Sequence, residues 1–72
     1  MTTVFKVKNL DCANCAKKLE RAINKLSTVK SANLVFMTGK LIVESDEDAD
    51  ILEEMILQTA KHVEPEAEIE LA

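Results

Sequence analysis

Apolar and polar residues alternate at the start and at the end of the chain. In residues 3–8, Phe5 and Val7 fall on one side and lysines on the other, and residues 66–71 alternate in the same manner. A period of two is typical of a β-strand with one buried face. Both segments are therefore predicted to be strands.

Two more strands are expected in the middle of the chain. The apolar content of residues 29–36 and 41–44 predicts a second and a third strand. Residues 37–40 form the turn between them, and Gly39 is the residue expected to take a positive φ there. These two strands should then form a hairpin.

Two segments carry apolar residues every three or four positions, which is the period of an α-helix packed on one side. The first follows Cys15 and ends at Ser27 and Thr28, and the second is stopped by Pro65. Leu57 falls outside the second stripe and is expected to be partly exposed. The stripes are Ala16, Leu19, Ala22, Ile23 and Leu26 in the first helix, and Ile51, Leu52, Met55, Ile56, Thr59 and Ala60 in the second.

Polar side chains near the start of each helix are candidates to cap it. Asp11 and Asn14 stand at the start of the first helix, and residues 45–48 precede the second. Short polar side chains accept hydrogen bonds from the first N–H groups of a helix, and negative charge is favourable there.

The predicted order of elements is β-α-β-β-α-β within a single domain, residues 1–72. Right-handed crossovers then give an α+β, ferredoxin-like sandwich: a four-stranded antiparallel sheet in the order 4-1-3-2, with both helices on one face. This topology brings three connections to one end of the sheet: the segment after the first strand, the turn at Gly39, and residues 61–65. Side chains far apart in sequence can therefore meet there.

Charge divides the chain into a basic and an acidic part. Residues 1–43 hold eight Lys and Arg against Asp11 and Glu20, whereas residues 44–72 hold eleven Asp and Glu against Lys61. Either the two parts pack beside each other and relieve each other's charge, or one face docks an oppositely charged partner. The net charge of −4 and the absence of Tyr and Trp argue against nucleic acid as a partner.

No segment of the sequence resembles a membrane span or a signal peptide. The longest apolar run, residues 34–37, is far shorter than the roughly 20 residues that cross a bilayer. We therefore expect a cytoplasmic location, where a Cys-x-x-Cys pair serves metal binding or redox chemistry more often than it forms a structural disulfide.

Cys12 and Cys15 are the only cysteines, and they lie where the first strand gives way to the first helix. The two-residue spacer lets both sulfurs face one ion, at about 2.3 Å if that ion is zinc. Lys17, Lys18 and the helix N-terminus favour the thiolate. The same features suit a dithiol that cycles with a disulfide. A closed structural zinc site normally takes four protein ligands and is less favoured here, as are two incidental thiols.

Asp11 is the next candidate, either as a helix cap or as a third ligand. Copper(I) is satisfied by two thiolates and gains little from an anionic oxygen, whereas zinc, cadmium and lead(II) accept mixed sulfur and oxygen ligands. An aspartate beside Cys12 therefore favours a divalent ion. His62 and Glu64, in the 61–65 connection, are weaker candidates for a further ligand.

The run from Val7 to Ala16, followed by an amphipathic helix, resembles the heavy-metal-associated domain, which has a Gly-Met-x-Cys-x-x-Cys motif and the same order of elements. The resemblance covers essentially the whole chain. It departs from the motif at Asn9, which stands in place of Gly, and at Leu10, which stands in place of Met. Asn9 could either stiffen the loop or itself take a positive φ. An acidic residue before the first cysteine is similar to the zinc-, cadmium- and lead-exporting branch.

The resemblance implies a metal-binding module, not an enzyme, that holds one Zn²⁺, Cd²⁺ or Pb²⁺ ion and transfers it by ligand exchange. It implies the N-terminal domain of a heavy-metal-exporting P-type ATPase, whose partners are other domains of that pump or a metal donor or acceptor protein. The alternatives are a free-standing metallochaperone, a copper(I) carrier and a small dithiol oxidoreductase. The domain is expected to be a monomer, with a metal-bridged dimer as an alternative.

Overall fold

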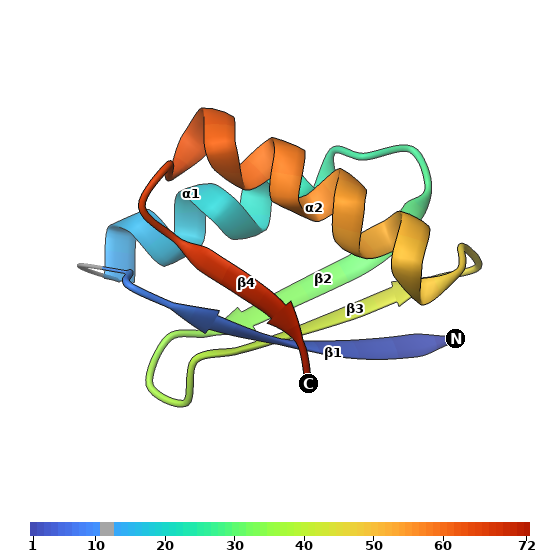
Figure 1. Ribbon diagram of the computed structural model, residues 1–72, viewed down its shortest axis with the longest axis horizontal. Coiled ribbons are helices and arrows are strands. Elements are labelled where there is room, and N and C mark those ends of the chain that lie inside the picture. The colour runs from blue at the N-terminus through green and yellow to red at the C-terminus, as the bar shows by residue number, and fades with distance from the viewer. Residues whose placement is uncertain (11–12) are drawn as a thin grey trace.

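The computed structural model describes residues 1–10 and 13–72. Four strands form one antiparallel sheet in the order β2-β3-β1-β4, and both helices cover the same face of it (Figure 1). This is the predicted 4-1-3-2 order and confirms the α+β ferredoxin-like fold. The elements are β1 (Thr2–Lys8), α1 (Ala13–Asn24), β2 (Val29–Val35), β3 (Lys40–Ser45), α2 (Ala49–Val63) and β4 (Glu68–Leu71).

The first strand occupies the centre of the sheet. It pairs with β3 from Thr2↔Glu44 to Lys6↔Lys40, and with β4 from Phe5↔Leu71 to Lys8↔Glu68. Strand β1 is therefore held on both sides, and the segment that carries the cysteine motif begins at the end of one of the two inner strands.

The core lies between the sheet and the two helices. Phe5 and Val7 are buried, as the alternation predicted, and they are joined by residues of both helical stripes. Burying a side chain of this size contributes about 1.5–3 kcal/mol. The core residues are Phe5, Val7, Ala16, Leu19, Ile23, Val29, Leu34, Leu41, Val43, Leu52, Ile56, Ala60 and Ile69.

The buried face of α2 is narrower than predicted. Leu52, Ile56 and Ala60, spaced four residues apart, are buried, whereas Ile51 is 47% exposed. At about 100° per residue, Ile51 points well away from the centre of that row, so the prediction that it is buried was wrong. Leu57 is half-buried and packs against the core, in agreement with its expected position beside the stripe.

Several predicted boundaries shift by a few residues. Helix α1 starts at Ala13, so Asn14 lies inside the helix rather than at its cap, and the helix ends at Asn24 rather than at Ser27. Strand β4 starts at Glu68 instead of residue 66, because the N–H of Ala67 donates to the carbonyl of Glu64 (3.0 Å) and closes a turn there.

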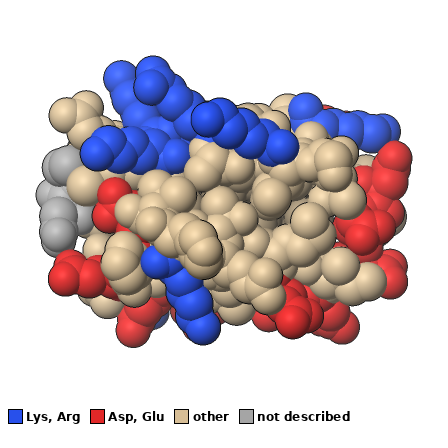
Figure 2. Space-filling view, turned by 90° about the horizontal axis from the view of Figure 1, so that it is seen from above, with Lys and Arg blue, Asp and Glu red and all other residues tan. Residues whose placement is uncertain are grey.

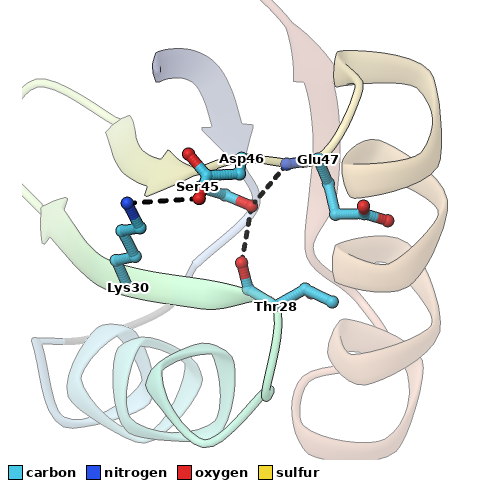
Figure 3. A network of polar contacts seen from close by, with 5 residues as sticks. All are labelled: Thr28, Lys30, Ser45, Asp46 and Glu47. Carbon is cyan, nitrogen blue, oxygen red and sulfur yellow. Dashed lines mark hydrogen bonds and ion pairs between the residues drawn. The ribbon is translucent and has the colours of Figure 1, made fainter.

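Ser45 joins the connections before β2 and after β3 (Figure 3). It lies at the end of the sheet where β1 begins, opposite the end from which the cysteine motif follows. We expected it to cap α2, but it is the last residue of β3 and is 1% exposed. Its hydroxyl donates to the Thr28 carbonyl (2.6 Å) and accepts from the Glu47 N–H (3.1 Å). Asp48 is the N-cap of α2 by position and makes no side-chain capping bond.

Candidate metal centre

The backbone just before the cysteine motif is fixed by three features. The N–H of Val7 donates to the carbonyl of Gly39 (2.8 Å). Asn9 has a φ of 64°, the positive value that the sequence allowed for it, and asparagine adopts this conformation more readily than most residues. Leu10 is partly buried against the core. The chain therefore turns sharply out of β1 from a defined position.

On the far side of the motif, Cys15 lies in the first turn of α1, as predicted, and is half-buried. Exposed N–H groups at a helix start stabilise a thiolate, and Lys17 and Lys18 add positive charge nearby. This environment suits a sulfur that ligates a metal ion. Asp11 and Cys12 lie outside the described residues, so their roles as ligands stay predictions.

The structure corrects the surroundings of His62. Residues 61–65 were expected to form a connection, but α2 continues to Val63, so His62 lies exposed in its last turn. Glu64 follows as the half-buried C-cap, and its N–H donates to the Ala60 carbonyl (2.7 Å). An open depression of about 310 Å³ beside His62 is lined by Gln58, Thr59, His62 and Val63, which supply no second ionisable group.

Within residues 1–10 and 13–72, no three His, Cys, Asp or Glu side chains come together as a metal cluster. The topology nevertheless brings the Glu64 connection to the motif's end of the sheet, because β4 pairs with β1 at Lys8↔Glu68.

Two ion pairs among the described residues join the basic and acidic parts of the chain: Lys8 with Glu70 (3.6 Å) and Lys30 with Asp46 (3.2 Å). Both are exposed and contribute little to stability. Neither involves the exposed cations Lys17, Lys18 and Arg21 of α1, or Lys25 directly after it. Figure 2 shows most of the visible Lys and Arg side chains along one long edge of the helical face, with one apart from them nearer the Asp and Glu residues. Charge relief within the chain is therefore only partial.

The sequence predicted only that Gly39 takes a positive φ in the turn at residues 37–40. Its φ of 66° confirms that role, but its carbonyl also contacts β1 at the entrance to the motif. The predicted strand order, which places the turn at Gly39 at the motif's end of the sheet, was the available signal for this contact.

A comparison with family models identifies the heavy-metal-associated domain over residues 4–62. This chain belongs to that family. The zinc/cadmium/lead-transporting P-type ATPase of Escherichia coli (strain K12) is 41% identical to it over 56 residues, and the cadmium, zinc and cobalt-transporting ATPase of Helicobacter pylori is 39% identical over 59 residues. The aligned segments cover 78% and 82% of this chain but only 8% of each relative.

Solved structures agree with the family assignment. The apo form of the N-terminal domain of ZntA superposes with a TM-score of 0.77 at 27% identity, covering 99% of this chain and 90% of that one. Its Zn(II) form gives a TM-score of 0.76 at the same identity, covering 97% and 89%. A copper-binding domain of the P-type ATPase HMA7 reaches 0.78 at 19% identity, covering 99% and 92%, which shows the shared fold alone. Within the described part of this chain, neither helix has the length and hydropathy of a membrane span.

Proposed function

We propose that this domain, residues 1–72, binds one soft divalent metal ion as cargo through the thiolates of Cys12 and Cys15 and passes it to a partner by ligand exchange. The observation that carries the proposal is the position of the Cys-x-x-Cys pair in the sequence, after β1 and with Cys15 in the first turn of α1, in a chain of the heavy-metal-associated family. The domain acts as a cytoplasmic metal-binding module and not as an enzyme by itself.

The oxygen of Asp11 is proposed as a third ligand, which makes Zn²⁺, Cd²⁺ or Pb²⁺ the preferred cargo over copper(I). The names of the E. coli and H. pylori relatives, which transport zinc and cadmium among other metals, support this choice. A copper(I) carrier on the same fold is the second candidate, because copper-binding domains share this fold.

The last coordination position is proposed to stay exchangeable. Water, the carboxylate of Glu64, the imidazole of His62 or a thiolate from a partner can fill it. An exchangeable position lets an acceptor add its ligand before a donor ligand leaves, so that the ion is never released into solution. Glu64 is favoured over His62 because it follows the helix, on the connection that leads into β4 beside β1.

The experiment that tests this proposal is a cadmium and zinc titration of the reduced protein in competition with a chelator. Cys12→Ser or Cys15→Ser should abolish tight binding of all ions and remove the cadmium–thiolate absorption. Asp11→Ala should weaken zinc and cadmium far more than copper(I), while Asp50→Ala, an exposed aspartate in α2, should change nothing. Glu64→Gln should weaken cadmium binding slightly, and His62→Gln should not.

Three outcomes would contradict parts of this assignment. Equal losses for zinc, cadmium and copper(I) in Asp11→Ala would remove Asp11 as the selective ligand. Tighter binding of copper(I) than of zinc under matched conditions, with two sulfurs and no oxygen around the ion, would favour the copper carrier. Reduction of insulin through a reversible Cys12–Cys15 disulfide, without metal retention, would favour the dithiol oxidoreductase.

We further propose that the chain serves as the N-terminal domain of a heavy-metal-exporting P-type ATPase. The relatives support this, since the chain aligns with about 8% of the length of each. Its partners are then other parts of that pump or a metal donor protein. The exposed cations Lys17, Lys18, Arg21 and Lys25 would attract an acidic surface on such a partner. A reading frame that encodes no membrane helices beside this domain would instead favour the free-standing metallochaperone.

A further inference from the structure

The β2–β3 turn touches β1 at Gly39, immediately before the metal-binding motif. The N–H of Val7 donates to the Gly39 carbonyl (2.8 Å), and a Cβ on Gly39 would lie 2.9 Å from the carbonyl oxygen of Val7. Real Cβ atoms essentially never come that close to a neighbouring atom. Only glycine therefore fits at this position without a displacement of backbone.

The turn has little freedom to move away from β1. The N–H of Gly39 donates to the carbonyl of Val35 (2.9 Å), which closes the turn on itself, and the next residue, Lys40, pairs with Lys6 in the sheet. The Lys6↔Lys40 pair is the last regular pair between β1 and β3. Beyond it, the Val7–Gly39 hydrogen bond continues the contact between the two segments.

Val7 in turn determines where the motif begins. Its side chain is 5% exposed within the core, Asn9 turns the chain two residues later, and Leu10 packs against the core. A shift of the Val7 carbonyl is therefore passed to the segment that leads into the proposed ligands. Residues that orient the ligands of a metal site affect its affinity even when they do not bind the ion themselves.

We propose that Gly39 is a positioning residue for the metal-binding motif, acting through its backbone contact with Val7. This inference rests on the proposed function. Gly39 acts through Val7: it lets the turn approach β1 closely enough to hold the residues that lead into the motif in one position. An L side chain at position 39 displaces those residues, so it lowers metal affinity beyond what reduced stability alone would explain.

Two variants separate the close contact from the positive φ. In Gly39→Asn, the side chain tolerates a positive φ but introduces the Cβ that meets Val7. In Gly39→Ala made in the D configuration, which chemical synthesis of a 72-residue chain permits, the positive φ is favourable and the methyl group takes the other position on Cα. Ile23→Val, a core change in α1 away from the contact, serves as the control for reduced stability alone.

The measurement is cadmium affinity by chelator competition, with the cadmium–thiolate absorption as a structural readout and urea unfolding of the apo protein as the stability readout. We expect Gly39→Asn to lose roughly tenfold or more in affinity, as other residues that support a metal site do. The cadmium affinities of the D variant and of Ile23→Val should stay within about twofold of that of the wild type, compared with the roughly tenfold loss expected when a supporting residue is removed. If Gly39→Asn does not fold, the same loss is expected for Val7 made as an ester in place of its amide, which removes the bond to Gly39.

Equal affinities in the wild type, Gly39→Asn and Ile23→Val would overturn the role of Gly39 and leave the proposed function intact. An affinity loss in the D variant as large as that in Gly39→Asn would also overturn it, because the close contact would not be the cause. Absence of cadmium binding by the wild type would overturn the proposed function, and this inference with it.

Discussion

Asn24, the last residue of α1, holds both backbone groups of Ala32 on the edge strand β2. Its side-chain amide donates to the Ala32 carbonyl (3.0 Å), and its oxygen accepts from the Ala32 N–H (2.9 Å). The Glu20 carboxylate accepts from the Leu34 N–H (2.7 Å) on the same edge. Exposed strand edges invite pairing with other chains, so α1 here covers an edge as well as a face of the sheet.

Replacement of Asn24 by alanine should therefore destabilise the domain. The variant loses the two bonds to Ala32 and a third to the Glu20 carbonyl (2.9 Å). Because these groups are exposed, water replaces part of the loss, and we expect about 1 kcal/mol. Urea unfolding followed by circular dichroism measures it, since the chain has no Trp or Tyr. Lys25→Ala, at the exposed neighbouring residue, is the control, and an equal effect there would contradict the role of Asn24.

Ser45→Ala should lower the free energy of unfolding by more than the loss of one small hydroxyl group suggests. Ser45 is buried, with its hydroxyl between Thr28 and Glu47 (Figure 3), and removal of the hydroxyl leaves a carbonyl and an N–H group of two half-buried residues without this partner. A loss of this kind costs about 1–3 kcal/mol. Ser31→Ala, at an exposed serine of β2, should change the free energy of unfolding by less than about 0.5 kcal/mol. Equal stability of the two variants would show that the Ser45 bonds contribute nothing.

Ile51 and Ile56 should respond very differently to truncation, although both belong to the apolar stripe of α2. Ile56 is fully buried, and Ile56→Ala should cost about 2–5 kcal/mol. Ile51 is 47% exposed, and Ile51→Ala should cost less than about 1 kcal/mol. Thermal and urea unfolding of the two variants tests the orientation of α2, and similar losses would mean that the helix is rotated from the position described above.

The exposed cations on and directly after α1 should accelerate metal transfer to an acidic acceptor. They are Lys17, Lys18, Arg21 and Lys25. The probe is a synthetic acidic peptide with a Cys-x-x-Cys pair, and the rate of cadmium transfer is followed by thiolate absorption. Arg21→Glu should slow transfer severalfold at low salt, because opposite charges steer association. Lys40→Glu makes the same charge change on β3 and should have a smaller effect. The difference should vanish in about 1 M salt, where charges are screened within about 3 Å; a difference that persisted would exclude electrostatic steering.

Local patterns were sufficient to predict the order of elements and most of the core. Alternation places Phe5 and Val7 in the core, and periodicity places Leu19 and Ile23 there, because each period states directly which side of an element faces inward. The strand order followed from handedness rules that apply to any chain with these elements. The positive φ at Gly39 was likewise expected from residue type and position, and a positive φ was one of two possibilities for Asn9.

Other features depended on neighbours that no local pattern identifies. Ile51 fits a helical stripe, but whether it is buried depends on which side of α2 meets the sheet. Ser45 has the composition of a helix cap, yet its partner is Thr28, brought beside it only when β2 and β3 pair.

By itself, the sequence determined the pair of cysteines, the aspartate beside them and the fold that carries them, because ligand chemistry and periodicity are properties of residue type and spacing. Only the tertiary structure decided that Gly39 presses against Val7, that Asn24 and Glu20 cover the edge of β2, and that His62 belongs to a helix. The contacts of Gly39, Asn24 and Glu20 join residues distant in sequence, so they form only when the sheet and helices pack together. The end of α2 also lies beyond the boundary that the sequence pattern predicted.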